Sequence, residues 1–475
     1  MNDNVSPFAE QANAYYQDLL RPVFAGRKFL IAAQIAAAVG LGGLARQLTR
    51  LGAERPFLLA GSEGTGALPT PEEAELRVLG IQSTDVLEDF RSLRHTLLNL
   101  PPDVRRDLDA WDPAGTARFI FASPLADSVD VAGRKAYAGR HPTWAALEDK
   151  VLIDSFWDAV GVRRAPSRIV AADYDALRSA TDELDRGLGT VWAADARDGT
   201  HGGGMGLRWV RHADDGRESF ASLRRMADRI RVMPFLEGVP ASIHGIVFPD
   251  AVAVFRPVEM VVLRPKAGDR LHYAGCATAF DPLPDDRKTM RALAYHVGVA
   301  LREAVDYRGP FGIDGILAED GYLPTELNAR AGGAMGRPLA QGNDLPLTPL
   351  CLAVTAGERL DYRPDLLEQT VVASADTHRT CMGWSVTALR VAENRMFDVL
   401  RDGDEYRECL PGEEPHGTLQ AGPGPVGGFV RFVLEPERIE LGRSAAPEVV
   451  RAFRFADRAL GTDFGEFDVA SDVRR

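Results

Sequence analysis

Cysteine is scarce in this sequence, and the few cysteines follow no motif. The chain of 475 residues has four cysteines and no Cys-x-x-Cys pair. So few scattered thiols exclude a disulfide framework, and their spacing does not predict a structural zinc site. They fit a protein of the reducing cytosol, and they lie at Cys276, Cys351, Cys381 and Cys409.

Excess positive charge and long apolar runs are also missing. The formal net charge is −13, which argues against nucleic acid as the main partner because phosphate backbones attract basic surfaces. The most apolar early stretch, Phe29–Ala45, is interrupted by Gln34 and is short for a membrane span of about 20 residues. It also begins too far from Met1 to be a secretory signal. We therefore expect a soluble cytoplasmic protein that binds neither nucleic acid nor a membrane.

The first 140 residues carry the pattern of an α/β domain. Hydrophobic residues make up 45% of the chain, which is enough for real cores, and the length suggests about three domains. Glycines follow the first two expected strands and suit either a phosphate cradle or tight turns, without the full dinucleotide fingerprint. We predict a Rossmann-like domain with strands at Phe29–Ala33, Pro56–Ala60 and Phe119–Ala122, and a helix at Val39–Leu51.

The most informative stretch is residues 311–330, FGIDGILAEDGYLPTELNAR. Its alternating pattern predicts a β-hairpin with a three-residue turn at Glu319–Gly321. With that turn, Ala318 pairs with Tyr322, and Asp314 pairs with Glu326. One face then carries polar residues and the other is a core face. The polar face is Asp314, Glu326, Asn328 and Arg330, and the core face is Ile313, Leu317, Leu323 and Leu327.

Two carboxylates opposite each other in a ladder lie roughly 5 Å apart and repel. A Mg²⁺ ion between Asp314 and Glu326 removes this repulsion, since it prefers one or two carboxylates and completes its shell with water and phosphate oxygens. Asn328 adds a neutral oxygen, and Arg330 adds a planar cation suited to phosphate or carboxylate. The alternative is a solvated face with a Glu–Arg pair.

The Glu-x-Asn-x-Arg pattern, with an acidic residue 12 positions upstream, resembles the metal-binding hairpin of ATP-grasp enzymes. The resemblance implies that Asp314, Glu326 and Asn328 hold Mg²⁺ on the phosphates of ATP. It also implies that Arg330 faces the reacting phosphate or acyl group. The fold class that it implies is α/β, with an ATP-grasp fold preceded by a Rossmann-like domain and followed by a small mixed α+β domain.

Two further segments resemble the phosphate-binding parts of that family. Lys150 opens a helical stretch and corresponds to a lysine that contacts ATP phosphates. Gly202, Gly203 and Gly204 correspond to the flexible loop that closes over the phosphates. The strand before this loop lacks the family's usual lysine, and the candidates to supply its charge are Arg197 and Arg208.

The stretch RVMPFLEG, residues 231–238, resembles the linker between the two halves of the family's nucleotide site. The resemblance implies that the backbone of Phe235 and Leu236 hydrogen-bonds adenine and that Glu237 accepts from the ribose hydroxyls. An ordinary strand ending in a Glu-Gly turn is the alternative.

Two arginines outside these motifs are further candidates. Arg256 follows an apolar strand and would face the phosphates, oriented by Glu259, although a surface ion pair is the alternative. Arg337 follows a glycine-rich turn and is a candidate for binding a substrate carboxylate.

The domain boundaries that we expect are 1–140, 141–355 and 356–475, with the central part divided into 141–232 and 233–355. In the C-terminal part the patterns predict strands at Thr370–Ala373 and Gly428–Leu434, and a hinge at Ala421–Gly428. A late helix is expected near Pro447–Leu460.

As a function, these features favour an ATP-dependent ligase that joins a small-molecule carboxylate to an amine through an acyl phosphate. The expected cofactors are ATP and Mg²⁺, and the three-part layout also resembles peptide ligases of natural-product pathways, as in pheganomycin biosynthesis. A nucleotide-binding protein that is not a ligase is the alternative, and a dinucleotide enzyme is a third option. The oligomeric state stays open, with a homodimer as one possibility.

Overall fold

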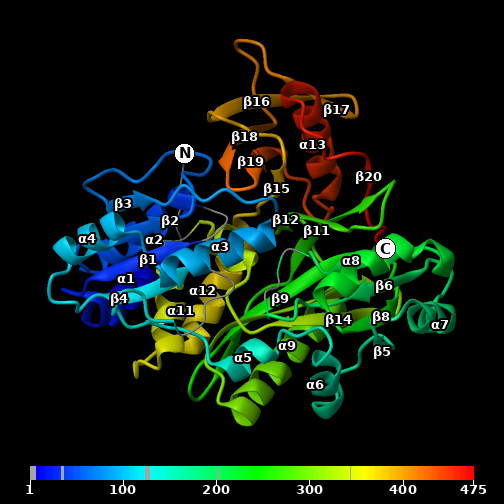
Figure 1. The fold of residues 1–475 in the computed structure, drawn as a ribbon, viewed down its shortest axis with the longest axis horizontal. Coiled ribbons are helices and arrows are strands. Elements are labelled where there is room, and N and C mark those ends of the chain that lie inside the picture. The colour runs from blue at the N-terminus through cyan, green and yellow to red at the C-terminus, as the bar shows by residue number, and fades with distance from the viewer. Residues whose placement is uncertain (1–6, 34–36, 123–128, 200–201, 203, 343) are drawn as a thin grey trace.

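The computed structural model describes residues 7–33, 37–122, 129–199, 202, 204–342 and 344–475. Figure 1 shows the chain arranged around four sheets, with the N-terminal sheet on one side, the two central sheets on the other and the C-terminal sheet above them. No helix in these described ranges is both long and apolar enough to cross a membrane. All four cysteines are free thiols.

The N-terminal sheet is parallel and has the order β3-β2-β1-β4. Its central strand β1 is fully buried, with Leu30 and Ala32 in the core on one face and Phe29 and Ile31 in the core on the other. Strand–helix alternation with helices over both faces makes this a Rossmann-like layer. It confirms the three strands and the helix expected here. The elements are α1 Pro7–Phe24, β1 Phe29–Ala33, α2 Ala37–Arg50, β2 Phe57–Ala60, β3 Glu75–Val78, α3 Val86–Leu98, α4 Pro102–Trp111 and β4 Arg118–Ala122.

The first central sheet is antiparallel, with the order β5-β8-β6-β7. Trp192 anchors it from β6, because its ring is fully buried and its indole N–H donates to the Thr181 hydroxyl on α7 at 2.9 Å. Two short helices, α5 Pro142–Ala146 and α6 Ile153–Ala159, precede it. The sheet and its helices are β5 Arg168–Ala171, α7 Tyr174–Leu184, β6 Thr190–Ala193, β7 Leu207–Val210, α8 Arg217–Met226 and β8 Arg229–Pro234.

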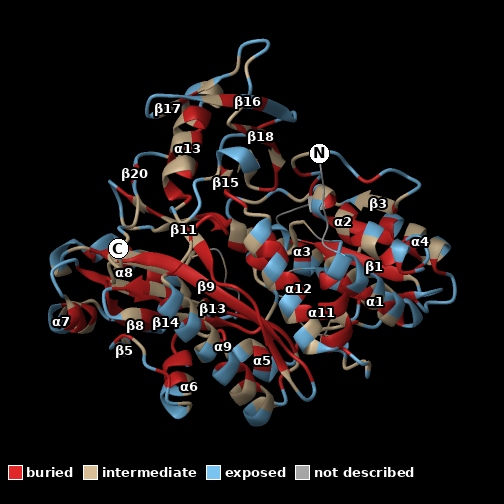
Figure 2. Ribbon diagram, turned by 180° about the vertical axis from the view of Figure 1, so that it is seen from behind, coloured by how far each residue is buried: buried red, intermediate tan, exposed pale blue. Residues whose placement is uncertain are grey.

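The second central sheet has the order β12-β11-β9-β13-β14, with β10 and the late strand β20 attached to it. Its middle strands are buried along most of their length, which Figure 2 shows as continuous red ribbons, and helix α9 packs against them through Met290 and Val297. The elements are β9 Val239–Val247, β10 Val252–Val254, β11 Val258–Pro265, β12 His272–Ala277, α9 Pro284–Val305, β13 Gly309–Ala318, β14 Gly321–Asn328 and β20 Phe467–Asp468.

The C-terminal sheet is antiparallel, with the order β15-β19-β18-β16-β17. Helix α13 packs on one face, where Phe432 and Leu419 meet Val449 and Phe453. The sheet and its helix are β15 Met382–Thr387, β16 Arg395–Asp402, β17 Glu405–Glu408, β18 Gly417–Gly424, β19 Gly427–Leu434 and α13 Ala446–Leu460. Three helices precede them along the chain and pack in the core shared with α1 and β1, namely α10 Arg337–Ala340, α11 Leu347–Ala356 and α12 Pro364–Thr377. The strand expected at Gly428–Leu434 and the late helix are confirmed.

Two expectations for this part are wrong. Thr370–Ala373 is not a strand but lies inside α12, because Leu367, Thr370, Val371 and Ser374 recur at helical spacing and form a buried stripe. The stretch Ala421–Gly428 is not a hinge, since it forms the close of the β18–β19 hairpin, in which Gly424 pairs with Gly427.

Candidate active site

The hairpin β13–β14 places Asp314 directly opposite Glu326, as the sequence predicts, but its turn and its ladder differ from the prediction. The turn has two residues rather than three, so Ala318 pairs with Gly321 and the predicted pairing with Tyr322 is wrong. An extra residue, Thr325, then interrupts the ladder between Pro324 and Glu326. This β-bulge restores the register that the shorter turn had shifted.

The bulge also changes which side chains face the core. Ile313, Leu317 and Leu327 lie in the core below the hairpin, as expected. Leu323 does not, because beyond the bulge the alternation is displaced by one residue and Tyr322 takes its place in that core. The Tyr322 hydroxyl donates to the backbone carbonyl of Ile313 at 2.8 Å, which fixes this arrangement.

The polar face of the hairpin forms one connected cluster. The Asp314 carboxylate accepts from the Ser242 hydroxyl at 2.6 Å and from the Asn328 amide at 2.9 Å. Burial raises the pKa of Asp314, and the charge of Glu326 raises it further. The two carboxylates therefore repel each other, and a cation placed between them would be attracted by both.

Lys150 reaches this cluster from the segment before α6. Its buried ammonium lies 2.9 Å from Asp195 and 3.4 Å from Glu326. Burial alone would lower the pKa of Lys150, but the charges of Glu326 and Asp195 raise it, so the side chain stays charged. The structure thus brings Lys150 to the hairpin, at the side where Glu326 lies.

Arg330 is held at the end of the hairpin. Its Nε donates to the Glu148 carboxylate at 3.0 Å, and Arg140 also pairs with Glu148. Against the effect of burial, the charges of Glu148, Glu326 and Asp314 raise the pKa of Arg330. Glu148 therefore fixes the position of a permanently charged group beside the carboxylate pair.

Sequence reasoning missed Arg231, which supports the bulge. Its side chain, on β8, is buried and donates to the backbone carbonyl of Thr325 at 2.8 Å, and it pairs with Asp154 at 2.7 Å. Arg197 and Arg208 do not supply a charge here. Arg197 pairs with Asp228, and the Arg208 guanidinium donates to Met205 and Leu207 carbonyls and to Ser222.

His244 is a second residue that sequence reasoning missed. It lies on β9 beside Ser242, with its Nε2 2.9 Å from the Ser242 hydroxyl. Burial and the charge of Arg330 lower the pKa of His244 to about 4, so the imidazole is neutral. The signal in the sequence was two polar residues at alternate positions in an otherwise apolar strand. Gly312 and Gly332 leave room for the ring, because a Cβ at either would lie within 2.8 Å of it.

The predicted linker residues lie at the end of β8, where the two central sheets meet. The Phe235 ring stacks on Trp209 at 4.2 Å, and its N–H already donates to the Gly189 carbonyl. The contact of the Phe235 and Leu236 backbone with adenine stays a prediction. Leu236 is half-buried beside Phe235. The Glu237 carboxylate accepts from Arg264 at 2.8 Å and from the Ser471 N–H at 3.1 Å.

The remaining predicted residues are dispersed. Gly202 and Gly204 lie before β7, and Gly203 lies outside the described residues. Arg256 as a phosphate ligand is wrong, because it is fully buried among the carbonyls of Ala375 and Phe280 and the carboxylate of Asp281. Glu259 does not orient it and instead pairs with Ser444 and the Ala445 N–H. Arg337 is exposed at the start of α10.

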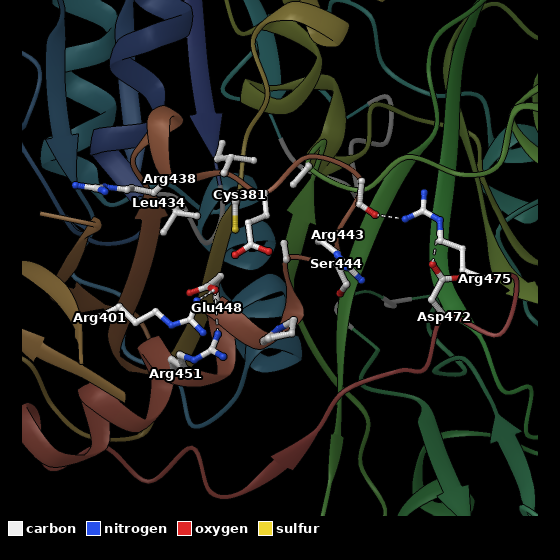
Figure 3. Close-up of a pocket in the computed structure, with 16 residues that line it drawn as sticks. Cys381, Arg401, Leu434, Arg438, Arg443, Ser444, Glu448, Arg451, Asp472 and Arg475 are labelled. Carbon is white, nitrogen blue, oxygen red and sulfur yellow. Dashed lines mark hydrogen bonds and ion pairs between the residues drawn. The ribbon is translucent and has the colours of Figure 1, made fainter. Parts of the chain in front are cut away.

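A separate cavity of about 330 Å³ lies in the C-terminal part, and none of the hairpin residues lines it. Figure 3 shows its arginines next to acids: Glu448 lies 3.5 Å from Arg401 and 2.9 Å from Arg451, and Asp472 lies 3.6 Å from Arg475. The lining of this cavity carries five arginines and three acids, whereas the hairpin brings two carboxylates together, so the hairpin is the better candidate for a step assisted by a metal. Within the described ranges no group of three or more His, Cys, Asp or Glu residues is placed to hold a metal ion.

Similar solved structures cover nearly the whole chain. The N5-carboxyaminoimidazole synthase from Aspergillus clavatus, solved with ADP and its aminoimidazole ribonucleotide, has a TM-score of 0.51 and 13% identity over 92% of this chain and 100% of that one. The L-amino acid ligase from Bacillus licheniformis has a TM-score of 0.50 and 14% identity over 90% and 97%.

The biotin carboxylase domain dimer of the Hydrogenobacter thermophilus 2-oxoglutarate carboxylase, solved with MgADP, ADP and bicarbonate, has a TM-score of 0.50 and 13% identity over 94% and 91%. At these identities the likeness establishes a shared fold. No family model and no curated protein matches the sequence.

Proposed function

Starting from the ATP-grasp fold that this chain has, we propose that it is an ATP-dependent ligase that joins a carboxylate to an amine. The observation that carries the proposal is the cluster of Asp314, Glu326 and Asn328 on one face of the β13–β14 hairpin, with Lys150 and Arg330 beside it. The substrates that fit the proposal are amino acids or small peptides.

The residues of the cluster fit a magnesium ion bound to ATP phosphates. They offer two carboxylates that repel each other and an amide whose N–H₂ already donates to Asp314, which leaves its oxygen as an acceptor for a cation. Mg²⁺ takes such a small protein set and completes its shell with phosphate oxygens and water. When bound there, the metal supplies neutralisation of phosphate charge during transfer of the phosphoryl group.

In the proposed reaction, an oxygen of the substrate carboxylate attacks the γ-phosphorus of ATP, and the bond to ADP breaks. The amine nitrogen then attacks the acyl carbon, phosphate leaves, and the amine loses a proton. Arg330, fixed by Glu148, is placed to stabilise negative charge on the acyl and phosphoryl oxygens. Lys150 and Arg231 add positive charge around Glu326, where the family's usual lysine is absent from the strand before the glycine loop.

The neutral imidazole of His244 has a different role in this proposal. Its Nε2 lies against the Ser242 hydroxyl, which in turn donates to Asp314. The chain His244–Ser242–Asp314 therefore fixes the rotamer of the carboxylate and leaves its other oxygen to Asn328 and a metal.

A nucleotide-binding protein without ligase activity is the second candidate. It is favoured by Glu237, the predicted ribose acceptor, since its carboxylate already accepts from Arg264 and from the Ser471 N–H. In this case ATP binds weakly or without turnover.

The test is release of phosphate from Mg-ATP against a panel of amino acids and dipeptides, with mass spectrometry of the products. A ligase gives phosphate and an amide product in equal amounts, and Glu326→Gln abolishes both while its thermal unfolding stays cooperative. ATP binding without phosphate release for any pair of substrates supports the second candidate. Full turnover in Glu326→Gln contradicts the role of the hairpin.

A further inference from the structure

Lys150 connects the carboxylate pair of the hairpin to the segment that follows β6. Its ammonium lies 2.9 Å from Asp195, two residues after the end of β6, and 3.4 Å from Glu326 on β14. The side chains of Lys150 and Asp195 are only 7% and 8% exposed. Two acids from distant parts of the chain therefore share one buried cation.

The two contacts of Lys150 are unequal. Asp195 uses both of its oxygens, because one accepts from the ammonium at 2.9 Å and the other accepts from the Lys150 backbone N–H at 2.7 Å. Glu326 accepts a single hydrogen bond of 3.4 Å, which is longer than the usual range of about 2.7–3.2 Å. Asp195 therefore anchors Lys150, whereas the contact with Glu326 is the one that can be exchanged.

Glu326 is also the more accessible of the two acids, with a side chain that is 23% exposed. Among the residues that the structure describes, its carboxylate has no hydrogen-bond or ion-pair partner other than Lys150. Asp314, opposite in the ladder, is different because its two oxygens accept from Ser242 at 2.6 Å and from Asn328 at 2.9 Å. A metal ion that binds the carboxylate pair therefore competes with Lys150 for Glu326.

An ammonium and a divalent metal ion oppose each other at one carboxylate. The two cations repel at contact distance, and both need the same oxygen lone pairs. Lysine can move to another acceptor, since it carries a compact charge with three donors on a flexible four-carbon chain. A phosphate is a strong acceptor for such a group. The arrival of a phosphate beside Lys150 would therefore free Glu326.

The sequence after β6 accounts for the anchor. It reads Ala194-Asp195-Ala196 and so carries an acid and no lysine. The positive charge at this place comes instead from Lys150, which belongs to the segment before α6. One ammonium thus serves both the end of β6, which leads to the glycine loop, and the carboxylate of Glu326.

We propose that Lys150 blocks Glu326 against a divalent metal ion until a nucleotide binds, and that Asp195 is the positioning residue that holds Lys150 during the exchange. Lys150 turns from Glu326 to a nucleotide phosphate, and Glu326 is then free for the metal ion that accompanies the phosphate. The protein therefore takes up metal only together with nucleotide. The inference rests on the proposed function, because it uses the same nucleotide site, and it describes the regulation of that site.

Electron paramagnetic resonance of Mn²⁺ tests the block directly. Mn²⁺ accepts the oxygen ligands of Mg²⁺, and its sharp signal in solution falls when the ion binds. Without nucleotide, the wild-type protein is expected to bind Mn²⁺ with a Kd above about 1 mM, and Lys150→Met about 10-fold more tightly or better. Lys135→Met removes an ammonium from an exposed pair with Asp130, and as the control it should match the wild type.

Two further variants show where the Mn²⁺ binds and protect against loss of fold. Lys150→Met/Glu326→Gln should lose the gained affinity, and Lys150→Gln, which keeps a donor for Asp195, should gain it as Lys150→Met does. Equal Mn²⁺ affinity in the wild type and in either Lys150 variant that unfolds cooperatively overturns the proposal. A gain that persists in the double variant does so too, as does a wild-type Kd below about 0.1 mM without nucleotide.

Binding of ADP in the presence of Mg²⁺, measured by calorimetry, tests the role of Asp195. Asp195→Asn is expected to weaken ADP binding about 10-fold, and Asp228→Asn, which breaks a surface pair with Arg197, is expected to leave it unchanged. Since Asp195 acts through Lys150, Lys150→Met/Asp195→Asn should bind ADP no more weakly than Lys150→Met alone. Additive losses would show a structural role for Asp195 and contradict the anchor. The Mn²⁺ measurement needs neither nucleotide nor turnover, so it decides the block even where no ligase activity is found.

Discussion

Replacing Asp314 by asparagine is expected to stabilise the ligand-free protein and to remove its nucleotide turnover. Asp314 faces Glu326 across the β13–β14 ladder, and burial together with this neighbour raises its pKa. Two carboxylates about 5 Å apart repel by roughly 3 kcal/mol at an effective dielectric constant of about 20. Asparagine has almost the same shape as aspartate and removes this repulsion.

Part of the gain is offset by weaker contacts. The Ser242 hydroxyl and the Asn328 amide donate to the carboxylate, and a neutral acceptor in its place costs about 1 kcal/mol. Arg330 and Lys150 also lose some attraction to the cluster. The net expectation is a gain of about 1–2 kcal/mol in the free energy of unfolding, or a rise in the midpoint of thermal unfolding of about 1–2 °C for a chain of this length.

The measurement is thermal and urea unfolding in the presence of a chelator, alongside phosphate release with Mg-ATP. Asp314→Asn should unfold at higher temperature than the wild type, gain less stability from Mg-ADP and release phosphate at least about 100-fold more slowly. Glu319→Gln, on the exposed turn of the same hairpin, is the control and should change neither quantity. A variant that is less stable without nucleotide, or that keeps its turnover, refutes the reasoning.

Three further outcomes are expected. Arg231→Lys keeps the charge but cannot bridge Asp154 and the Thr325 carbonyl at once, so turnover should fall about 10-fold with a lower midpoint of unfolding; unchanged turnover would show that the bulge does not need this contact. Burial raises the pKa of Glu259 from 4.5 to about 7, against the hydrogen bonds from Ser444 and Ala445, so the native state favours the protonated form and loses stability as pH rises through this range. Glu259→Gln should remove a pH-dependent loss of roughly 3 kcal/mol, visible as a smaller difference in urea unfolding between pH 5 and pH 8, and an equal difference in both proteins would contradict the assignment. Gly332→Ala should disturb His244, since a Cβ there would lie 2.8 Å from the ring, and it should lower phosphate release more than Gly43→Ala in α2, where nothing lies within 4 Å.

The sequence predicted those features that depend on short-range pattern. Alternation in residues 311–328 indicated the hairpin, but the pairing of Asp314 with Glu326 was predicted correctly only because the bulge at Thr325 offsets the shorter turn. The strands around Phe29–Ala33 followed from their apolar runs. The β-branched residues of Thr370–Ala373 misled the same reasoning, because helical burial against other elements outweighed strand propensity. Local pattern is thus reliable where one face of an element is clearly polar.

The pattern of residues along the sequence could not predict contacts between distant segments. Arginine often binds phosphate, but Arg256 is enclosed by carbonyls from segments that lie 24 and 119 residues away in the sequence. Arg231 and His244 belong to the site because strands distant in sequence meet there, and their positions in apolar strands carry only a weak signal.

The single extra residue at Thr325 has a consequence for how the length of this hairpin can vary. The ladder pairs Gly315 with Pro324 on one side of the bulge and Asp314 with Glu326 on the other. Loss of Thr325 alone would therefore leave both pairs in place, and the two acids would stay on one face of a hairpin with less local twist. Related chains that lack this residue should keep the carboxylate pair as long as the two-residue turn is kept.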